Sequence, residues 1–184
     1  NGEPVKMSKR SGNFVTLADV VNEVGKDVVR FTMLTRKADA QMDFDFAKVV
    51  EVSRDNPVFY VHYAHARIRR LGRKAAAEGI AADAGAVARL DAEDLELVKL
   101  AAQFPRIVES AALAREPHRI AFYLYDLAAA FHGYFNLGQE RADRRVVMVN
   151  DRELTAARLF LVDGIGQIIR NGLSIMGVAA VEEM

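Results

Sequence analysis

The sequence predicts an all-α protein, in which a helical bundle is preceded by a small helical adaptor that carries a basic loop. Apolar residues recur every three or four positions through most of the chain, which is the spacing of a helix that buries one face. Threonine, aspartate and proline stand where these segments begin, and such residues favour helix N-termini. Because 51% of the 184 residues are hydrophobic, the helices have enough apolar surface for a packed core.

The N-terminal part predicts a loop followed by two short helices. Thr16 and Asp19 have the three-residue spacing of a capping box, and Gly25 can end the helix that they begin. Glycine, proline and asparagine surround the basic run that precedes them, as is typical of a loop. The expected elements are a loop over 1–15 with a brief strand over 4–7, helices over 17–24 and 27–36, and a connector over 39–46.

The remainder predicts a series of longer helices. Pro57 removes a backbone donor and should begin a new helix or kink the old one, while Asp91 and Asp151 stand at further helix starts. Gly172 is expected to end the last helix. The expected elements are a helical pattern over 46–71 broken at position 57, a linker over 75–86, helices over 91–104, 105–115, 117–135 and 151–171, and a charged loop over 138–150 with a strand-like stretch over 146–149.

Three regions are expected from this pattern. They are a basic loop over 1–15, a helical adaptor over 16–54 and a helical domain over 55–184. The opening Asn1 is not a methionine, so we expect that the chain was cut from something longer. Gly164 and Gly166 interrupt the last helical pattern, where they most simply permit close contact between helices.

Composition limits the classes of function. The chain has 25 basic and 25 acidic residues, so its net charge gives no sign of a nucleic-acid partner, although five cations gather at Arg67, Arg69, Arg70, Arg73 and Lys74. It contains no cysteine, which excludes disulfides and thiolate metal sites and is compatible with a cytoplasmic location. Charged residues interrupt every apolar run before it could span a bilayer, so no membrane partner is expected.

The basic loop is the most informative stretch for chemistry. Its three cations, two hydroxyls and one glycine could surround a polyphosphate, because lysine and arginine supply charge and glycine permits close backbone approach. The same composition also occurs in ordinary solvated loops, so the residues alone leave both interpretations open. The residues concerned are Lys6, Ser8, Lys9, Arg10, Ser11 and Gly12.

Lys6-Met7-Ser8-Lys9 resembles the KMSKS loop of class I aminoacyl-tRNA synthetases. Arg10 stands where the last serine of that motif is usual, a form found in the synthetases for arginine. Further stretches are similar to the arginyl-tRNA synthetase family and its helical DALR-type anticodon-binding domain. These stretches are Asp43-Phe44-Asp45-Phe46, residues 55–68 around His62-Tyr63-Ala64-His65, Glu116-Pro117-His118, residues 123–128, and residues 171–184.

The resemblance implies a set of functional residues. Lys9 would act in catalysis, because its charge would offset the charge that builds on the pyrophosphate leaving group. In the full-length enzyme ATP would be a substrate with Mg²⁺, arginine would be activated, and tRNA(Arg) would be the partner of a monomer. The ATP-binding residues would be Lys6, Met7, Ser8, Lys9 and Arg10, and the tRNA-binding residues would be Tyr63, Arg67, Arg70, Tyr134 and Met184.

One absence qualifies that expectation. Neither a HIGH-type motif nor a βαβ nucleotide-binding pattern occurs in these residues, and the family places both upstream of the KMSK loop. The fragment alone is therefore expected to be inactive and to bind no cofactor.

Aromatic residues and histidines also allow plainer interpretations. Without the resemblance, Tyr63 is more simply a core residue, since aromatic side chains at helical spacing usually are; with it, Tyr63 and Arg67 face tRNA. Tyr134 lies in a similar cluster with Phe131 and Phe135. His62 and His65 are three apart but lack a third ligand, so no metal site is expected. One of them should be buried and the other near tRNA, while His118 and His132 should be structural.

Two other functions stay open at the level of sequence. A cysteinyl-tRNA synthetase shares the loop, the adaptor and a related helical domain, although the match at residues 63–68 argues against it. The chain could also be a non-enzymatic helical interaction module in which the KMSK string is accidental. Arginine-dependent charging by the full-length protein would separate these alternatives.

Overall fold

The computed structural model describes residues 15–37, 39–40, 49 and 56–184, and all of its regular elements are helical. The expected loop over 1–15, with its strand over 4–7, lies outside the described residues except for position 15. The connector over 39–46 and the helical pattern before position 57 also fall largely outside them. The predicted all-α fold class is confirmed for the part of the chain that is described.

Two short helices form the adaptor. Helix α1 (Leu17–Val24) has the predicted capping box, in which Thr16 Oγ1 accepts from the backbone amide of Asp19 and the Asp19 carboxylate accepts from Thr16. Gly25 ends it with φ of 86°, a backbone conformation that glycine adopts without strain. Helix α2 (Lys26–Leu34) follows directly and buries Phe31. Both expected helices are therefore confirmed, the second with slightly different ends.

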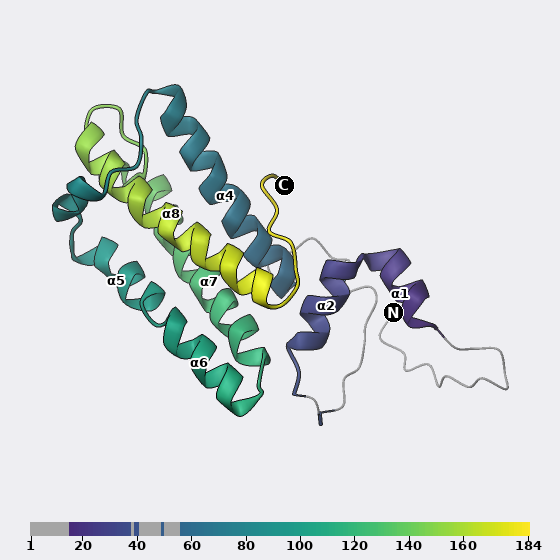
Figure 1. Cartoon of the computed structure of the whole chain (residues 1–184). Helices are drawn as coiled ribbons and strands as arrows, with labels where there is room; N and C mark the ends of the chain where they lie inside the picture. Colours follow the sequence, from purple (N-terminus) through teal and green to yellow (C-terminus); the bar gives the residue numbers. More distant parts are fainter. Residues whose placement is uncertain (1–14, 38, 41–48, 50–55) are drawn as a thin grey trace, which may run out of the picture.

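Five longer helices form the bundle, in which α4 and α8 run alongside α7, and α5 and α6 also pack against α7 (Figure 1). Pro57 begins α4, the Asp91 side chain caps α5 with a capping box to Asp94, and Asp151 caps α8. These predicted starts are confirmed. The bounds are α4 Pro57–Ala77, α5 Ala92–Ala101, α6 Phe104–Ala114, α7 His118–Glu140 and α8 Arg152–Ile175, with two short 3₁₀ helices, η2 Ala84–Arg89 and η3 Ala142–Arg144.

The structure corrects two expected connections. Helix α4 extends to Ala77 and so includes the first residues of the linker expected over 75–86. The last residues of that linker begin η2, which packs against α8. No strand occurs over 146–149 among the described residues; Val146 and Val147 are instead buried as an irregular segment. Their apolar character reflects packing into the core rather than pairing in a sheet.

Helix α8 does not end at Gly172 as expected. Gly172 lies inside the helix, where a Cβ would meet Leu124 Cδ2 at 2.7 Å, so glycine allows this close approach to α7. Gly166 makes a similar approach to Ile68 of α4, as predicted, whereas nothing lies within 4 Å of a Cβ placed at Gly164, so the prediction is wrong there. Gly177, with φ of 68°, turns the chain after the helix.

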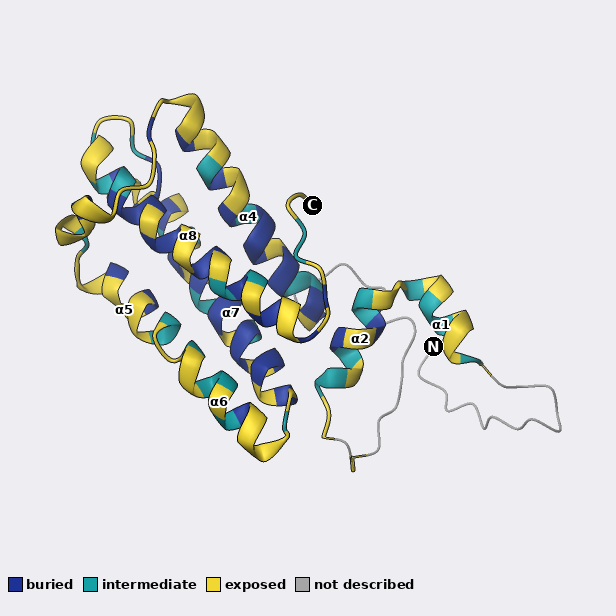
Figure 2. Ribbon diagram, viewed as in Figure 1, coloured by how far each residue is buried: buried dark blue, intermediate teal, exposed yellow. Residues whose placement is uncertain are grey.

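The buried faces of α4, α7 and α8 meet in one hydrophobic core (Figure 2). The segment after α8 returns along α4 and joins the bundle to the adaptor. Arg30 of α2 donates from Nε to the Met176 carbonyl, and the Ala179 amide donates to Asp27 Oδ2 at 3.1 Å. Among the described residues, no helix is long and apolar enough to cross a membrane.

Candidate nucleic-acid interface

One side of α4 presents a row of side chains to solvent. Tyr63, Arg67, Arg70 and Lys74 follow one another at helical spacing, and we call these four residues the α4 face. The opposite side of the helix packs into the core through residues such as Val61 and Ile68. Tyr63 is 45% exposed, and neither Arg70 nor Lys74 makes an ion pair with another described residue. The α4 face therefore offers an aromatic ring and two uncompensated cations to an anionic partner.

Arg67 lies between two aromatic rings. Its Cζ is 4.2 Å from the ring centroid of Tyr63 and also 4.2 Å from that of Phe135 on α7. Its Nη2 donates to the Tyr63 hydroxyl at 2.6 Å. Both distances from Cζ to a ring centroid lie well within the range of a cation–π interaction, so the two rings and the hydroxyl together hold the guanidinium.

His132 of α7 completes the surroundings of Arg67. Its Nδ1 is 2.9 Å from Arg67 Nη1, and its Nε2 is 3.2 Å from the Tyr60 carbonyl oxygen. Since a guanidinium only donates and a carbonyl only accepts, Nδ1 accepts and Nε2 carries the proton. Burial lowers the pKa of His132, and the nearby Arg67 charge lowers it further, although the bond to Tyr60 opposes them. The ring is therefore held neutral.

Phe135 and His132 are residues that the sequence did not associate with Arg67. His132 was expected to be structural, and its burial agrees with that expectation, while its contacts with Tyr63 and Arg67 of α4 were not foreseen. The helical spacing of Phe131, His132 and Phe135 indicates a shared side of α7. Which helix meets that side depends on tertiary packing, so spacing alone could not reveal the contact.

Tyr134 was expected to bind tRNA, but the structure buries its side chain. It is 6% exposed, and its hydroxyl donates to Asp94 Oδ1 at 2.7 Å. Burial and this carboxylate raise the pKa of Tyr134, so the hydroxyl keeps its proton and remains a donor. A ring enclosed in this way cannot stack on a base. Phe131 is also fully buried.

Tyr134 belongs to a group of polar side chains between α5, η3 and α8. Arg158, 1% exposed, forms an ion pair from Nε to Asp94 Oδ1 at 3.3 Å, and Asp94 is fully buried. Arg144 donates to both Asp91 and Glu93. Asp94, Tyr134, Arg144 and Arg158 are buried, whereas Asp91 and Glu93 are half-exposed at the edge of the group. We call these six residues the buried ion-pair cluster.

The C-terminal segment covers the other basic residues of α4. Arg69 binds Glu182 at 2.7 Å and Arg73 lies 3.3 Å from Glu183, so these two cations are offset by carboxylates. The charge that the sequence concentrates between positions 67 and 74 is thus divided between two sides of the helix. Met184, one of the predicted tRNA-binding residues, follows these carboxylates and is exposed.

The histidines of α4 are both buried, so the prediction that one of them faces solvent is wrong. His65 Nδ1 is 2.7 Å from the Val181 carbonyl oxygen, where it helps to fix the C-terminal segment. Burial lowers the pKa of His62, against the opposing effects of the Ala179 backbone and Asp27. Within the described parts of the chain, no group of three or more His, Cys, Asp or Glu residues could hold a metal ion.

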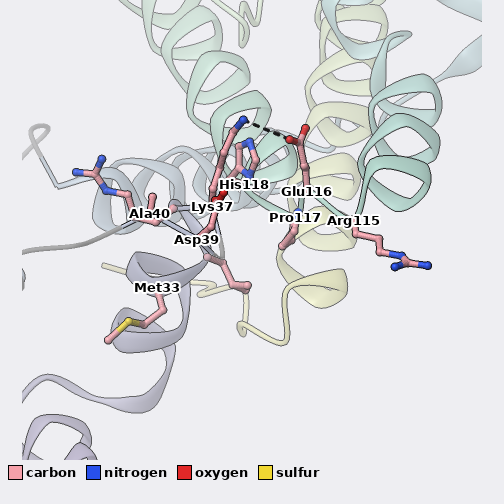
Figure 3. A pocket seen from close by; sticks show the side chains of 10 residues that line it. Met33, Lys37, Asp39, Ala40, Arg115, Glu116, Pro117 and His118 are labelled. Atoms are coloured by element: carbon pink, nitrogen blue, oxygen red, sulfur yellow. Dashed lines mark ion pairs between the residues drawn. The ribbon is translucent and has the colours of Figure 1, made fainter.

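A separate pocket lies between the end of α2 and the α6–α7 turn (Figure 3). Its volume is about 510 Å³, and Lys37 forms an ion pair across it with Glu116 at 3.4 Å. His118 contributes a buried imidazole to its wall. None of the predicted site residues lines this pocket. The predicted ATP-binding residues, Lys6, Met7, Ser8, Lys9 and Arg10, lie outside the described residues.

Comparison with known proteins identifies one family over most of the chain. The family model for the DALR anticodon binding domain matches residues 61–184. An arginine–tRNA ligase of Novosphingobium aromaticivorans is 68% identical over 184 residues, which are all of this chain and 32% of that protein. An arginine–tRNA ligase of Rhizobium meliloti is 56% identical over 193 aligned positions, covering all of this chain and 33% of that protein.

Solved structures give the same match. A Campylobacter jejuni protein described as an arginyl-tRNA synthetase superimposes with a TM-score of 0.81 at 31% identity, covering the whole of this chain and 38% of that one. The Thermus thermophilus arginyl-tRNA synthetase gives a TM-score of 0.74 at 27% identity over 96% of this chain and 29% of its own. The chain thus spans about a third of the length of the curated relatives that it matches.

Proposed function

Because the chain belongs to the DALR anticodon-binding family in its arginyl-tRNA synthetase form, we propose that it binds the anticodon region of tRNA(Arg) through the α4 face. Bases in a tRNA loop are unstacked and can be splayed onto aromatic side chains, while arginine and lysine bind the phosphates beside them. The observation that carries the proposal is the exposed ring of Tyr63 in one row with Arg70 and Lys74, whose charges no described carboxylate offsets.

Met184 is the second proposed contact. Of the two predicted tRNA-binding residues outside α4, it is the one that the structure leaves exposed, and the ion pairs of Glu182 and Glu183 fix the segment that leads to it. An unbranched thioether packs readily on a flat base, because it has several rotatable bonds and a polarisable sulfur. Met184 would then add an apolar contact to the stacking and phosphate contacts of the α4 face.

A titration with two RNAs tests this function. The chain is titrated with tRNA(Arg) and with the same tRNA in which the anticodon bases are replaced, at several salt concentrations. Base readout by stacking and hydrogen bonds should weaken binding of the altered tRNA at every salt concentration, while the salt dependence, set by phosphates, should be similar for both. Equal affinity for the two RNAs would contradict anticodon recognition.

The whole protein is proposed to be an arginine–tRNA ligase, a monomer of the cytoplasm that uses ATP with Mg²⁺ to activate arginine. Within it, Lys6, Met7, Ser8 and Arg10 would surround the ATP phosphates and Lys9 would offset negative charge on the leaving pyrophosphate. Lys9→Ala in the full-length ligase should slow adenylate formation about a hundredfold or more, with little change in arginine binding. An unchanged single-turnover rate would remove Lys9 from the mechanism.

A further inference from the structure

Arg67 is held by side chains of the protein itself. Its Cζ lies over two rings, Tyr63 on the same helix and Phe135 on α7, at 4.2 Å from each centroid. One nitrogen donates to the Tyr63 hydroxyl at 2.6 Å and the other to His132 Nδ1 at 2.9 Å. An arginine that served mainly as a phosphate contact would instead direct its fork of donors outward, as suits a bidentate anion.

His132 also fixes the position of the Arg67 guanidinium. It is buried, its Nε2 is anchored to the Tyr60 carbonyl oxygen at 3.2 Å, and its ring stacks on Tyr63 with 5.4 Å between centroids. Further rings surround it, because Tyr60 lies 4.6 Å and Phe131 5.8 Å from its centroid. A histidine held by its backbone bond and its neighbours can present Nδ1 in one direction only, which is toward Arg67.

We propose that Arg67 and His132 are positioning residues for Tyr63: His132 holds the guanidinium, and the guanidinium holds the ring and hydroxyl of Tyr63 ready to stack on an anticodon base. This inference rests on the function proposed above and concerns how the same surface works. A ring that is already fixed in its binding orientation loses less conformational entropy when RNA binds, so the pair raises affinity without touching RNA. Arg70 and Lys74 supply the phosphate contacts.

The salt dependence of tRNA binding separates positioning from phosphate contact. Each lost phosphate contact lowers the slope of log affinity against log salt by about one unit or less. Arg67→Met keeps the length of the stem between the rings but removes the charge. It should weaken binding by up to about tenfold, the scale of ordering one side chain, and leave the slope unchanged. Arg70→Met, the matched control, should lower the slope.

Two substitutions at His132 separate positioning from packing. His132→Asn keeps an oxygen acceptor near the place of Nδ1, whereas His132→Phe keeps an aromatic ring and removes the acceptor. Affinity for tRNA should fall severalfold in His132→Phe and recover in His132→Asn. When Tyr63→Ala is already present, His132→Phe should have no further effect, because the residue that it positions is gone.

Tyr63→Phe supplies a variant that is safe for folding, since the side chain is exposed and only the hydroxyl is removed. It should weaken binding modestly with an unchanged salt slope. Equal lowering of the slope by Arg67→Met and Arg70→Met would overturn the inference, as would equal affinity of His132→Asn and His132→Phe when both melt like the parent chain. If Tyr63→Ala and Arg70→Met also bind tRNA unchanged, the proposed function itself has failed.

Discussion

The α4 face and the buried ion-pair cluster both combine a tyrosine with arginines, yet they differ in exposure. Each places a tyrosine hydroxyl beside an ionic partner: Tyr63 accepts from Arg67, and Tyr134 donates to Asp94. Tyr63 is 45% exposed and Tyr134 only 6%. The comparison teaches that burial, rather than residue type, decides whether such a pair stabilises the fold or is available to a partner.

The energies of the two regions should differ accordingly. In the buried ion-pair cluster, removal of one partner leaves a charge without compensation in the interior, which is strongly destabilising. On the α4 face water can solvate whatever a substitution uncovers, so the fold should tolerate changes there. Substitutions in the cluster should therefore lower the free energy of unfolding, whereas substitutions on the α4 face should lower tRNA affinity.

The largest effect is expected for Arg158→Ala. Arg158 is 1% exposed and pairs with Asp94, which has no access to solvent. Its loss should lower the free energy of unfolding by about 3 to 5 kcal/mol, measured by urea denaturation. Arg70→Ala, an exposed control, should change stability by no more than about 0.5 kcal/mol. A loss below about 1 kcal/mol for Arg158→Ala would mean that the cluster adds little to the fold.

A smaller loss is expected for Tyr134→Phe. The substitution removes the hydroxyl that donates to Asp94 Oδ1 at 2.7 Å but keeps the ring in the core. The free energy of unfolding should fall by about 1 to 3 kcal/mol, because the buried carboxylate loses a hydrogen bond. Affinity of the folded protein for tRNA should not change. A specific loss of tRNA affinity, with stability intact, would restore Tyr134 to the binding surface.

The sequence predicted helix starts better than helix ends. Starts at Leu17, Pro57 and Ala92 depend on capping side chains and a proline close by in the chain, so local spacing was sufficient. The glycine at position 172 instead reflects its close contact with Leu124, which lies 48 positions earlier in the sequence. Local spacing contains no sign of it, and Gly172 was therefore mistaken for a helix end.

The same limit applies to the candidate site. The expectation that Tyr63 and Arg67 lie together agrees with the structure, where Arg67 donates to the exposed Tyr63. Spacing could not show that Tyr134 faces Asp94, because the two residues lie on different helices. The role of His132 was hidden for the same reason. Burial arises from the meeting of helices, which a single periodic pattern does not describe.

The smallest effect concerns pH. Burial lowers the pKa values of His62 and His132 below the ordinary value of 6.5, so the folded state favours their neutral forms. Their contribution to stability is complete above about pH 6.5 and is lost as the pH falls below it toward the lowered folded-state values. The urea midpoint should decrease between pH 7.5 and pH 5.5. His132→Asn should show a weaker decrease, and an equal one would exclude His132 as a contributor.

The most direct test of the central claim, that the α4 face binds RNA while the buried ion-pair cluster maintains the fold, is Tyr63→Ala measured by both tRNA titration and thermal melting. The account predicts a loss of about 1 to 3 kcal/mol in tRNA binding, the value of stacking one base on a ring, with a melting curve close to that of the parent chain. A strongly lowered melting temperature, together with unaltered tRNA affinity in the molecules that remain folded, would contradict it.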